Sequence, residues 1–486
     1  MSIRRNTAYN LVGAAVPMVL ALATVPIYLE EIGVERFGIL SIAWLLLGYF
    51  GVFDLGLSRA TAHQIAVRPD QSEIDHAETF WTAIATNLCL GVLGAALLWV
   101  AGVWYFSWHI DTTDTLRQEA ISAMPFLALA VPVATTSGVM FGALQGRQRF
   151  KEINAISILS ATLLQLFPLG LAVWLGPSLS ILLSAALISR LLTMALIWKY
   201  CRSTVIGKYI PQFNRRIMRK LLNYGGWVAL TSLLGPFLVI IDRFAIGALL
   251  GAVAVAIYTL PFQLAQRLSV IGSSISSALF PRLSASKYDE QELLSDRATK
   301  ALASVMTLPT LMAILVMDPF LRFWIGGELS LQSAPIGKIL FIGFWINAFA
   351  TVPYALLQAR GRPDLVAKTH IAEIPLYLGL LWFSMSYVGL VGAAMVFSLR
   401  CAVDYLLLTR VARRSWGVSA YLIRALSILS VGALISTYFP LPDPRGWAAL
   451  VVLGTLALAV SWFASPPEVK GMITGMRKRV LQKGLW

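Results

Sequence analysis

Residues 141–150 read FGALQGRQRF, and residues 354–363 read YALLQARGRP. Both stretches contain the pattern L-Q-x-R-x-R, first at residues 144–149 and again at residues 357–362. Each pattern follows one long apolar run and precedes another, as a turn between two helices does. Weak similarity between distant parts of one chain is the usual sign of an internal structural repeat. The turns therefore predict a fold that is built twice.

The composition is that of an integral membrane protein. Of 486 residues, 58% are hydrophobic and 13% are charged, whereas an ordinary soluble domain has about 25% charged residues. A helix that crosses the ~30 Å apolar core of a bilayer needs ~20 apolar residues, and the uncharged run 8–29 is long enough. Two arginines before this run also suit a signal peptide, but the run is about twice as long as the apolar part of one, so we expect a retained first helix.

The sequence predicts fourteen helices, separated by short breaks rich in glycine, proline or charge. Their expected ranges are 8–30, 38–58, 79–108, 119–144, 153–175, 178–199, 222–249, 252–281, 299–325, 335–358, 369–388, 391–410, 421–439 and 446–464. With both termini in the cytoplasm, most Lys and Arg residues fall in inner segments, as the positive-inside rule requires. The outer loops then contain only Arg36, Arg117, Lys338 and Arg445. Anionic lipid headgroups, rather than nucleic acid, account for the net charge of +15.

The repeated turns follow the fourth and the tenth predicted helix. Arg190 in the sixth helix and Arg400 in the twelfth are separated by nearly the same distance along the chain. The turns and these two arginines thus recur at nearly the same separation. This agreement favours two six-helix lobes, related by an axis along the membrane normal, over chance similarity between arginine-rich turns. The predicted organisation is an N-terminal lobe (1–200), a basic cytoplasmic linker (201–221), a C-terminal lobe (222–412), and an extra helix pair with a basic cytoplasmic tail (413–486).

Arginines inside the predicted spans are the first candidates for a binding site. An arginine at the centre of a bilayer costs roughly 2.5–3.5 kcal/mol on insertion scales, so it must face protein, water or a partner. The predicted eighth helix also has polar residues along one face, which indicates either a water-filled cavity or hydrogen bonds between helices. We favour the cavity for Arg267, because no carboxylate lies within one turn of it. The residues of this stripe are Thr259, Gln263, Arg267, Ser274 and Ser277.

Carboxylates in or near the spans are candidates either for ion coupling or for ion pairs. A buried carboxylate that takes up a proton links transport to a proton gradient, whereas one that stays charged neutralises an arginine. The second role is expected for Asp242, which is adjacent to Arg243, and for Asp404, which follows Arg400 by one turn and suits an i,i+4 ion pair. The full set of candidates is Asp54, Asp242, Glu373 and Asp404.

Several function classes are disfavoured by what the sequence lacks. It has no GxxxxGK[ST] loop for ATP and no HExxH or GxSxG motif. Its three scattered cysteines, without a CxxC pair, indicate neither a metal site nor a disulfide framework. The predicted outer loops are too short to hold a catalytic domain. We therefore expect no catalytic residue, no cofactor, no metal and no nucleic-acid partner.

Four stretches together resemble the bacterial polysaccharide and O-antigen flippases of the multidrug/oligosaccharidyl-lipid/polysaccharide exporter superfamily. They are FDLGLSRAT (53–61), IDRFAIGALLG (241–251), the two Q-x-R-x-R turns, and GAAMVFSLRCAVDYLLL (392–408). The resemblance covers essentially the whole chain. It implies an all-α membrane protein with two pseudo-symmetric six-helix lobes around a central cavity and with alternating access. It implies export of oligosaccharide linked to undecaprenyl pyrophosphate across the bacterial inner membrane, with polysaccharide polymerase and glycosyltransferases as partners.

A pyrophosphate is a double anion, and the planar fork of arginine binds phosphate through two parallel hydrogen bonds. In the related lipid II flippases, cavity arginines lie on the first, second and eighth helices. Here only Arg267, and Arg59 near a helix end, match that pattern, which argues against lipid II as the cargo. The predicted substrate-binding residues are Arg59, Arg190, Arg243, Gln263, Arg267 and Arg400.

Three alternatives remain open. An ion-coupled multidrug antiporter of the same superfamily binds cationic drugs through membrane carboxylates, but the first predicted helix has no interior carboxylate and the candidates are mostly basic. A membrane glycosyltransferase or polysaccharide ligase needs a catalytic residue beside a sizeable loop. A purely structural scaffold leaves the central arginines without an explanation.

Overall fold

The computed structural model describes residues 3–49, 54–67, 73–412, 420–441 and 443–465. The described part is helical and contains no strand, which confirms the predicted all-α fold. Eleven of its helical segments are long and apolar enough to cross a membrane, so the predicted count of fourteen spans is not confirmed.

The helices of the first half are α1 (Ile3–Ile32), α2 (Val34–Tyr49), α3 (Leu57–Val67), α4 (Glu73–Trp108), α5 (Asp114–Gly146), α6 (Phe150–Leu175), α7 (Leu179–Cys201) and the π-helical η2 (Arg202–Ile206). They are followed by α8 (Arg215–Gln266), α9 (Ser269–Ala285), α10 (Tyr288–Ile325), α11 (Gly327–Ala359), α12 (Pro363–Val388), α13 (Leu390–Val411), α14 (Ala420–Tyr438) and α15 (Pro444–Ala464).

The chain forms two compact units, residues 1–256 and residues 257–486. In the first unit α3 and α4 pack on α5, and α5 and α6 pack on α7. In the second unit α9 and α10 pack on α11, and α11 and α12 pack on α13. Adding six to each helix number of the first unit gives the packing partners of the second unit, so that α5 corresponds to α11 and α7 to α13. This agreement confirms the duplication that the repeated turns indicated, while the predicted lobe boundaries stay a prediction.

The two L-Q-x-R-x-R turns adopt the same backbone. The fifth position has a positive φ in both, 58° at Gln148 and 69° at Gly361. The N–H of the fifth position donates to the carbonyl of the second, and the N–H of the sixth donates to the carbonyl of the first. These four distances lie between 2.9 and 3.0 Å, for Gln148–Gln145, Arg149–Leu144, Gly361–Gln358 and Arg362–Leu357.

The first arginine of each turn reaches the residues that directly follow α7 in the first unit and α13 in the second. The Arg147 Nε donates to the backbone oxygen of Thr204, just beyond α7, over 3.1 Å. The Arg360 Nη1 donates to the backbone oxygen of Ala412, directly after α13, over 2.6 Å. The turn therefore carries arginine at this position in both repeats because it ties two helix ends together, which is a structural role.

The second helix of each repeat is broken. The predicted helix 38–58 is wrong over its last residues, because residues 54–56 form a turn with positive φ at Leu55 (47°) and Gly56 (74°), and α3 begins at Leu57. The predicted helix 252–281 begins where expected, at the non-helical Gly251 (φ 86°, ψ 173°), but it is interrupted at residues 267–268. Asp54 and Arg267 are separated by the same number of residues as the two turns, so the breaks are equivalent.

A ridge of glycines lets α3 approach α5 closely. Gly138, Gly142 and Gly146 recur every four residues on α5, and a Cβ added at Gly142 would lie only 2.2 Å from the backbone oxygen of Ser58. Small residues at this spacing are the common means of close helix packing in membranes. The packing holds the short helix α3, with the turn that precedes it, against the body of the first unit.

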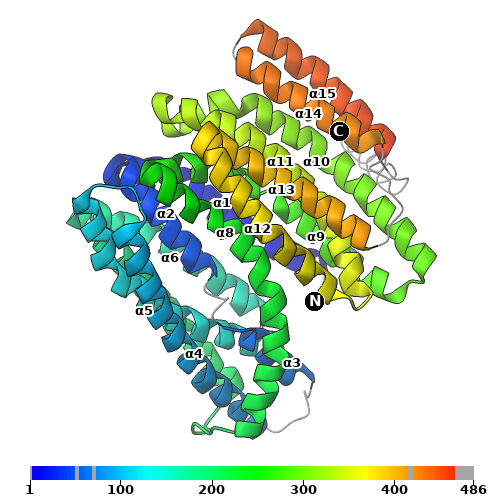
Figure 1. The fold of residues 1–486 in the computed structure, drawn as a ribbon. Helices are drawn as coiled ribbons and strands as arrows, with labels where there is room; N and C mark the ends of the chain where they lie inside the picture. The colour runs from blue at the N-terminus through cyan, green and yellow to red at the C-terminus, as the bar shows by residue number, and fades with distance from the viewer. Residues whose placement is uncertain (1–2, 50–53, 68–72, 413–419, 442, 466–486) are drawn as a thin grey trace, which may run out of the picture. The chain divides into compact units, whose positions relative to one another are not determined.

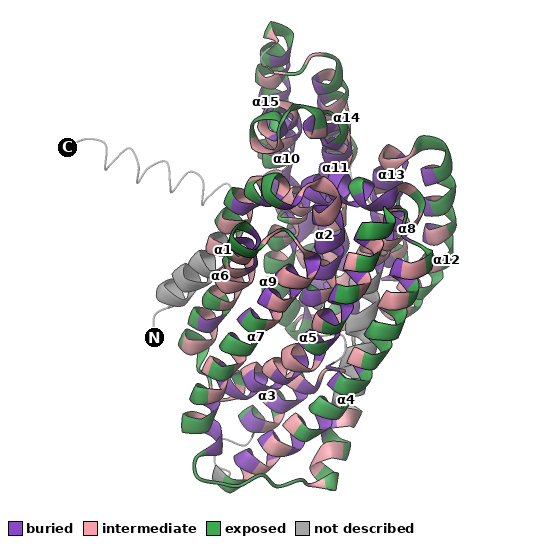
Figure 2. Cartoon of the chain, turned by 90° about the vertical axis from the view of Figure 1, so that its left-hand side faces the viewer, coloured by how far each residue is buried: buried purple, intermediate pink, exposed green. Residues whose placement is uncertain are grey.

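Helix α11 is the central helix of the second unit. Figure 2 shows it mainly in the colour of buried residues, whereas α12 is mostly intermediate or exposed. Lys338 was expected in an outer loop, but it lies inside α11 and is buried. Its Nζ is 2.8 Å from Asp318 Oδ2 on α10 and 3.3 Å from Thr437 Oγ1 on α14, so the lysine joins three helices.

The repeated turns provide a matched pair of substitutions. Gln148→Gly should raise the thermal stability of the purified protein slightly, because a left-handed residue other than glycine costs roughly 1–2 kcal/mol, partly offset by the entropy that glycine loses on folding. Gly361→Gln should lower it by roughly 1–2 kcal/mol, since the space around Gly361 is open and only the backbone is strained. Thermal unfolding in detergent measures both, and an unchanged midpoint for Gly361→Gln would contradict the assignment.

Candidate functional site

The break between α8 and α9 places Arg267 inside an apolar segment. Helix α8 ends at Gln266 and α9 begins at Ser269, within a segment, Leu238–Ala285, that is apolar enough to cross a membrane. Arg267 lies about midway between the Gly251 kink and the end of α9. Its side chain is exposed, and it forms no hydrogen bond or ion pair with any residue that the structure describes.

A helix break frees backbone N–H and C=O groups, and membrane proteins tolerate it where it is buried in protein or lines a water-filled cavity. Arg267 is exposed, so the break is not wholly buried in protein. The backbone at the break stays hydrogen-bonded, because the N–H of Val270 donates to Arg267 O and that of Ile271 to Leu268 O, so the positive charge at this point is that of the guanidinium. The break therefore forms a cationic point in the membrane-spanning part of the chain, suited to an anion.

The predicted polar stripe is only partly formed, because the break divides it between two helices. Gln263, one turn before Arg267, is half-buried, but Thr259 is buried. Ser274 and Ser277 are exposed on α9, and each hydroxyl donates to its own helix, to Val270 O over 2.6 Å and to Ser273 O over 2.8 Å. Gln263 and Arg267 are the members that remain candidates for a ligand.

A second polar cluster lies between α12 and α13. The Arg400 guanidinium carbon is 5.6 Å from the centre of the Tyr377 ring and 5.6 Å from that of Phe397. The predicted Arg400–Asp404 ion pair is not formed; Asp404 Oδ1 is 3.3 Å from His370 Nε2 instead. An arginine that precedes an acid by four residues has the less favourable order for a helical pair, and the two ring faces attract the guanidinium away from it.

Arg190 occupies the equivalent position in the first unit but has a different partner. Its Nη2 donates to the backbone oxygen of Leu47 over 2.8 Å. Leu47 lies on α2. The dipole of this carbonyl group thus stabilises the cation, and no carboxylate of the described residues forms an ion pair with it.

Asp242 and Arg243 form the expected ion pair, with Asp242 Oδ1 2.8 Å from Arg243 Nη1. Their side chains are 0% and 2% exposed, so the predicted charge neutralisation is confirmed. In the first unit Asp54 is also buried, and its Oδ1 accepts from the N–H of Ser58 over 3.0 Å. Asp54 therefore stabilises the first turn of α3. Arg59, on the same helix, is exposed.

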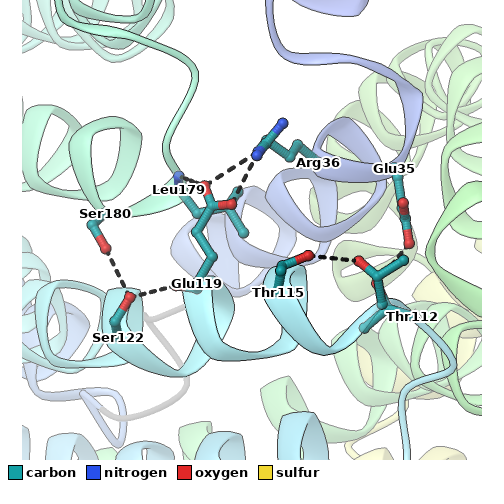
Figure 3. A network of polar contacts seen from close by, with 9 residues as sticks. Glu35, Arg36, Thr112, Thr115, Glu119, Ser122, Leu179 and Ser180 are labelled. Carbon is teal, nitrogen blue, oxygen red and sulfur yellow. Dashed lines mark hydrogen bonds and ion pairs between the residues drawn. The ribbon is translucent and has the colours of Figure 1, made fainter.

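A network that the sequence analysis missed joins the ends of α2, α5 and α7 (Figure 3). The carboxylate of Glu119 accepts from Arg36 Nε at 3.1 and 3.2 Å and from the N–H of Leu179 at 2.6 Å. Leu179 is the first residue of α7, and Ser178 before it forms no side-chain cap, so Glu119 caps the helix from α5. No sequence signal links these residues, because 83 positions separate Arg36 from Glu119.

A helical fold that is built twice, with charged groups inside segments able to cross a membrane, is that of a multi-pass membrane protein. The chain is similar to the solved structure of the lipid II flippase MurJ in an inward closed conformation, with a TM-score of 0.68 and 14% identity over 94% of this chain and 98% of that one. It is also similar to an inward-facing multidrug resistance MATE family transporter of the MOP superfamily, with a TM-score of 0.66 and 18% identity over 87% of this chain and 99% of that one. At such identities the likeness establishes the fold alone.

The family model described as "Polysaccharide biosynthesis protein" matches residues 3–287, and the chain belongs to that family. A relative from Shigella flexneri, named "Putative O-antigen transporter", is 28% identical over 409 residues, which cover 84% of this chain and 97% of that protein. A relative from Haloferax volcanii, named "Probable low-salt glycan biosynthesis flippase Agl15", is 26% identical over 58% of this chain and 59% of that protein. The resemblance stated from the sequence motifs is confirmed.

The buried ion pair in the first unit predicts a large loss of stability. Asp242→Ala should destabilise the protein by roughly 3–5 kcal/mol, because it removes a hydrogen-bonded counter-charge from the buried Arg243. Asp296→Ala is the control: the Asp296–Lys300 pair has a similar separation, 2.6 Å, but is about 40% exposed, so its loss should cost at most about 1 kcal/mol. Thermal unfolding of the two variants in detergent should separate them, and equal losses would contradict this reasoning.

Proposed function

We propose that this protein is a flippase that moves oligosaccharide repeat units, linked to undecaprenyl pyrophosphate, from the cytoplasmic to the outer leaflet of the bacterial inner membrane. Its membership of the polysaccharide biosynthesis family supports this role. So do the names of its relatives, an O-antigen transporter and a glycan flippase. The cargo then serves the assembly of a surface polysaccharide, with a polymerase and glycosyltransferases acting before or after the export step.

The observation that carries the proposal is the exposed Arg267 at the break between α8 and α9, whose side chain has no partner among the described residues. A pyrophosphate needs a cationic site, and the planar guanidinium of Arg267 provides hydrogen-bond donors and positive charge together. The half-buried Gln263, one turn earlier, is placed to donate from its amide. The polyprenyl tail remains in lipid while the headgroup crosses the membrane by alternating access.

The other predicted substrate residues contribute less directly in this proposal. Arg190 is engaged by the end of α2, and Arg400 lies over two aromatic rings, so each is a secondary contact for the sugar or phosphate. Arg243 is buried and neutralised by Asp242, and it has no part in the proposed site. Both termini are proposed to be cytoplasmic, as the distribution of basic residues indicates.

An ion-coupled multidrug antiporter is the second candidate, because one of the structural relatives is a MATE transporter. Such a protein exports cationic drugs, and a cationic point at Arg267 repels them. The two functions make opposite demands on the charge of the site, so one experiment distinguishes them.

Deletion of the gene in the source bacterium tests the function. We expect undecaprenyl-linked repeat units to accumulate while the surface polysaccharide disappears, and the accumulated glycan then identifies the cargo. Lipid extracts analysed by mass spectrometry and surface polymer analysed on gels measure the two quantities. Unchanged lipid-linked glycan, together with increased sensitivity to cationic drugs, would contradict the flippase and support the antiporter.

Complementation of the deletion strain tests Arg267. Arg267→Ala should reduce export on the order of 10- to 100-fold, the range expected when hydrogen bonds to a charged group are lost. Arg267→Lys should retain part of the activity, since it keeps the charge but not the planar fork. The matched control is Arg424→Ala, an exposed arginine of α14 that also forms no hydrogen bond or ion pair with described residues. Normal export by Arg267→Ala at a normal protein level would remove Arg267 from the site.

A further inference from the structure

The linker segment, residues 202–220, joins α7 to the start of α8 and is strongly basic. It contains six cations, whereas the whole stretch 153–241 contains no Asp or Glu. The six side chains are exposed, and none of their charged groups forms a hydrogen bond or an ion pair with a described residue. They are Arg202, Lys208, Arg215, Arg216, Arg219 and Lys220. The described residues therefore supply no counter-charge for this segment.

Three large apolar side chains are exposed in the same segment. Tyr209 is 38%, Ile210 is 72% and Phe213 is 58% exposed. In water these side chains would forgo the free energy that apolar burial provides. Basic residues on one side of a segment and aromatic or aliphatic residues beside them are typical of a chain that lies in the interface of a membrane.

Asn214 holds the linker segment against α4. Its backbone N–H donates to Thr82 Oγ1 over 3.1 Å, and its Nδ2 donates to Glu78 Oε1 over 2.9 Å. Its Oδ1 accepts from the N–H groups of Arg216 and Ile217, at 2.8 and 3.4 Å, so the same side chain caps the first turn of α8. One residue thus fixes both the place of the segment on α4 and the start of α8.

The first turns of α8 have an apolar side and a basic side. Leu221 is fully buried in a core cluster with Leu57 of α3, Ala83 of α4 and Val139 of α5, and Ile217 packs on the same cluster. The four cations of these turns are exposed. At ~3.6 residues per turn they lie together on the side of the helix that faces away from the cluster. Packing of the apolar side therefore directs the cations outward.

The length of α4 places the linker segment at a membrane surface. Trp104 and Trp108, near the other end of α4, are exposed, as is common for tryptophan at a membrane–water interface. Thr82 precedes Trp104 by 22 residues, about 33 Å along the helix, and Glu78 precedes Trp108 by 30 residues, about 45 Å. A bilayer has an apolar core of ~30 Å and measures ~40–45 Å with its headgroups. The contacts of Asn214 with α4 thus lie at the level of the opposite headgroup layer.

We propose that the linker segment is a membrane-surface anchor that binds anionic lipid headgroups. Its cations lie among the headgroup phosphates, where the planar fork of arginine binds phosphate oxygens through two hydrogen bonds. Ile210 and Phe213 reach the boundary between the headgroups and the acyl chains. Because Asn214 joins the segment to α4 and caps α8, the bound lipid stabilises the start of α8 against the first unit.

A lipid surface accounts for more of these features than a soluble acidic partner does. The segments on both sides of it, Leu179–Ile206 and Leu238–Ala285, are apolar enough to cross a membrane, so the bilayer is close to the linker segment in every case. Anionic lipids attract clusters of Lys and Arg beside such spans. A bilayer also supplies phosphate groups and an apolar layer together, at the depth that α4 sets.

A spin label at position 213 tests the anchor in nanodiscs. Phe213→Cys is labelled in a Cys89→Ser background, because Cys89 is exposed whereas the other two cysteines are buried. In nanodiscs that contain phosphatidylglycerol, the label should be more accessible to oxygen than to a water-soluble nickel chelate. In phosphatidylcholine alone it should move toward water. The control is Glu290→Cys, exposed on α10 and about 50 Å along the helix from Phe323, which should stay in water in both lipids.

A titration with phosphatidylglycerol tests the cations. Arg219→Gln, added to the labelled protein, should raise the lipid fraction that gives half of the change about fivefold, the effect of one cation at an anionic surface. Lys368→Gln is the matched control, because Lys368 is 73% exposed but pairs with Asp364. It should leave the midpoint unchanged.

Three results would overturn the anchor. A label that stays in water in both lipids would exclude a membrane contact and indicate a soluble partner. A label at the same depth in both lipids would exclude anionic headgroups as the ligand, and this comparison needs no charge variant to fold. An unchanged midpoint for Arg219→Gln would remove the cations from the contact. The nanodiscs contain no cargo, so the result is independent of the proposed flippase.

Discussion

The cost of placing charge in an apolar environment is the constraint on which the rest of this structure depends. Three cationic side chains inside helices long enough to cross a membrane each contact a specific partner. Arg243 is paired with Asp242, and Lys338 is paired with Asp318. Arg190, which is half-buried, donates to the backbone oxygen of Leu47 on α2. The Asp242–Arg243 pair lies within α8, whereas the contacts of Lys338 and Arg190 each join two helices.

Against this background Arg267 stands out, because it is exposed at a helix break and its side chain has no partner among the described residues. An arginine in that setting requires an anion or water. It lies in residues 257–486, although the helices of that unit repeat the packing of the first. The duplicated fold thus supplies two similar frameworks, and a few substituted side chains make them chemically different.

Local patterns in the sequence predicted part of this account. The repeated turns indicated the duplication, and the adjacency of Asp242 and Arg243 indicated their ion pair. Both signals could be read from the sequence because each pattern is formed by residues that are close together in the chain. The breaks at residues 54–56 and 267–268 were not predicted, since hydropathy is continuous across them and neither contains proline. The Arg400–Asp404 pair was predicted wrongly, because spacing shows which residues share a helix face but not which neighbouring rings attract a guanidinium.

The sequence by itself determined that the protein is helical, lies in a membrane and is built twice, because apolar run length and repeated motifs are properties of the linear chain. Only the tertiary structure decided the partner of each charged group. Glu119 reaches Arg36 across 83 residues, and Arg190 reaches Leu47 across 143. Contacts at such separations depend on how whole helices pack, and in this protein they decide which charges are neutralised and which are open to a ligand.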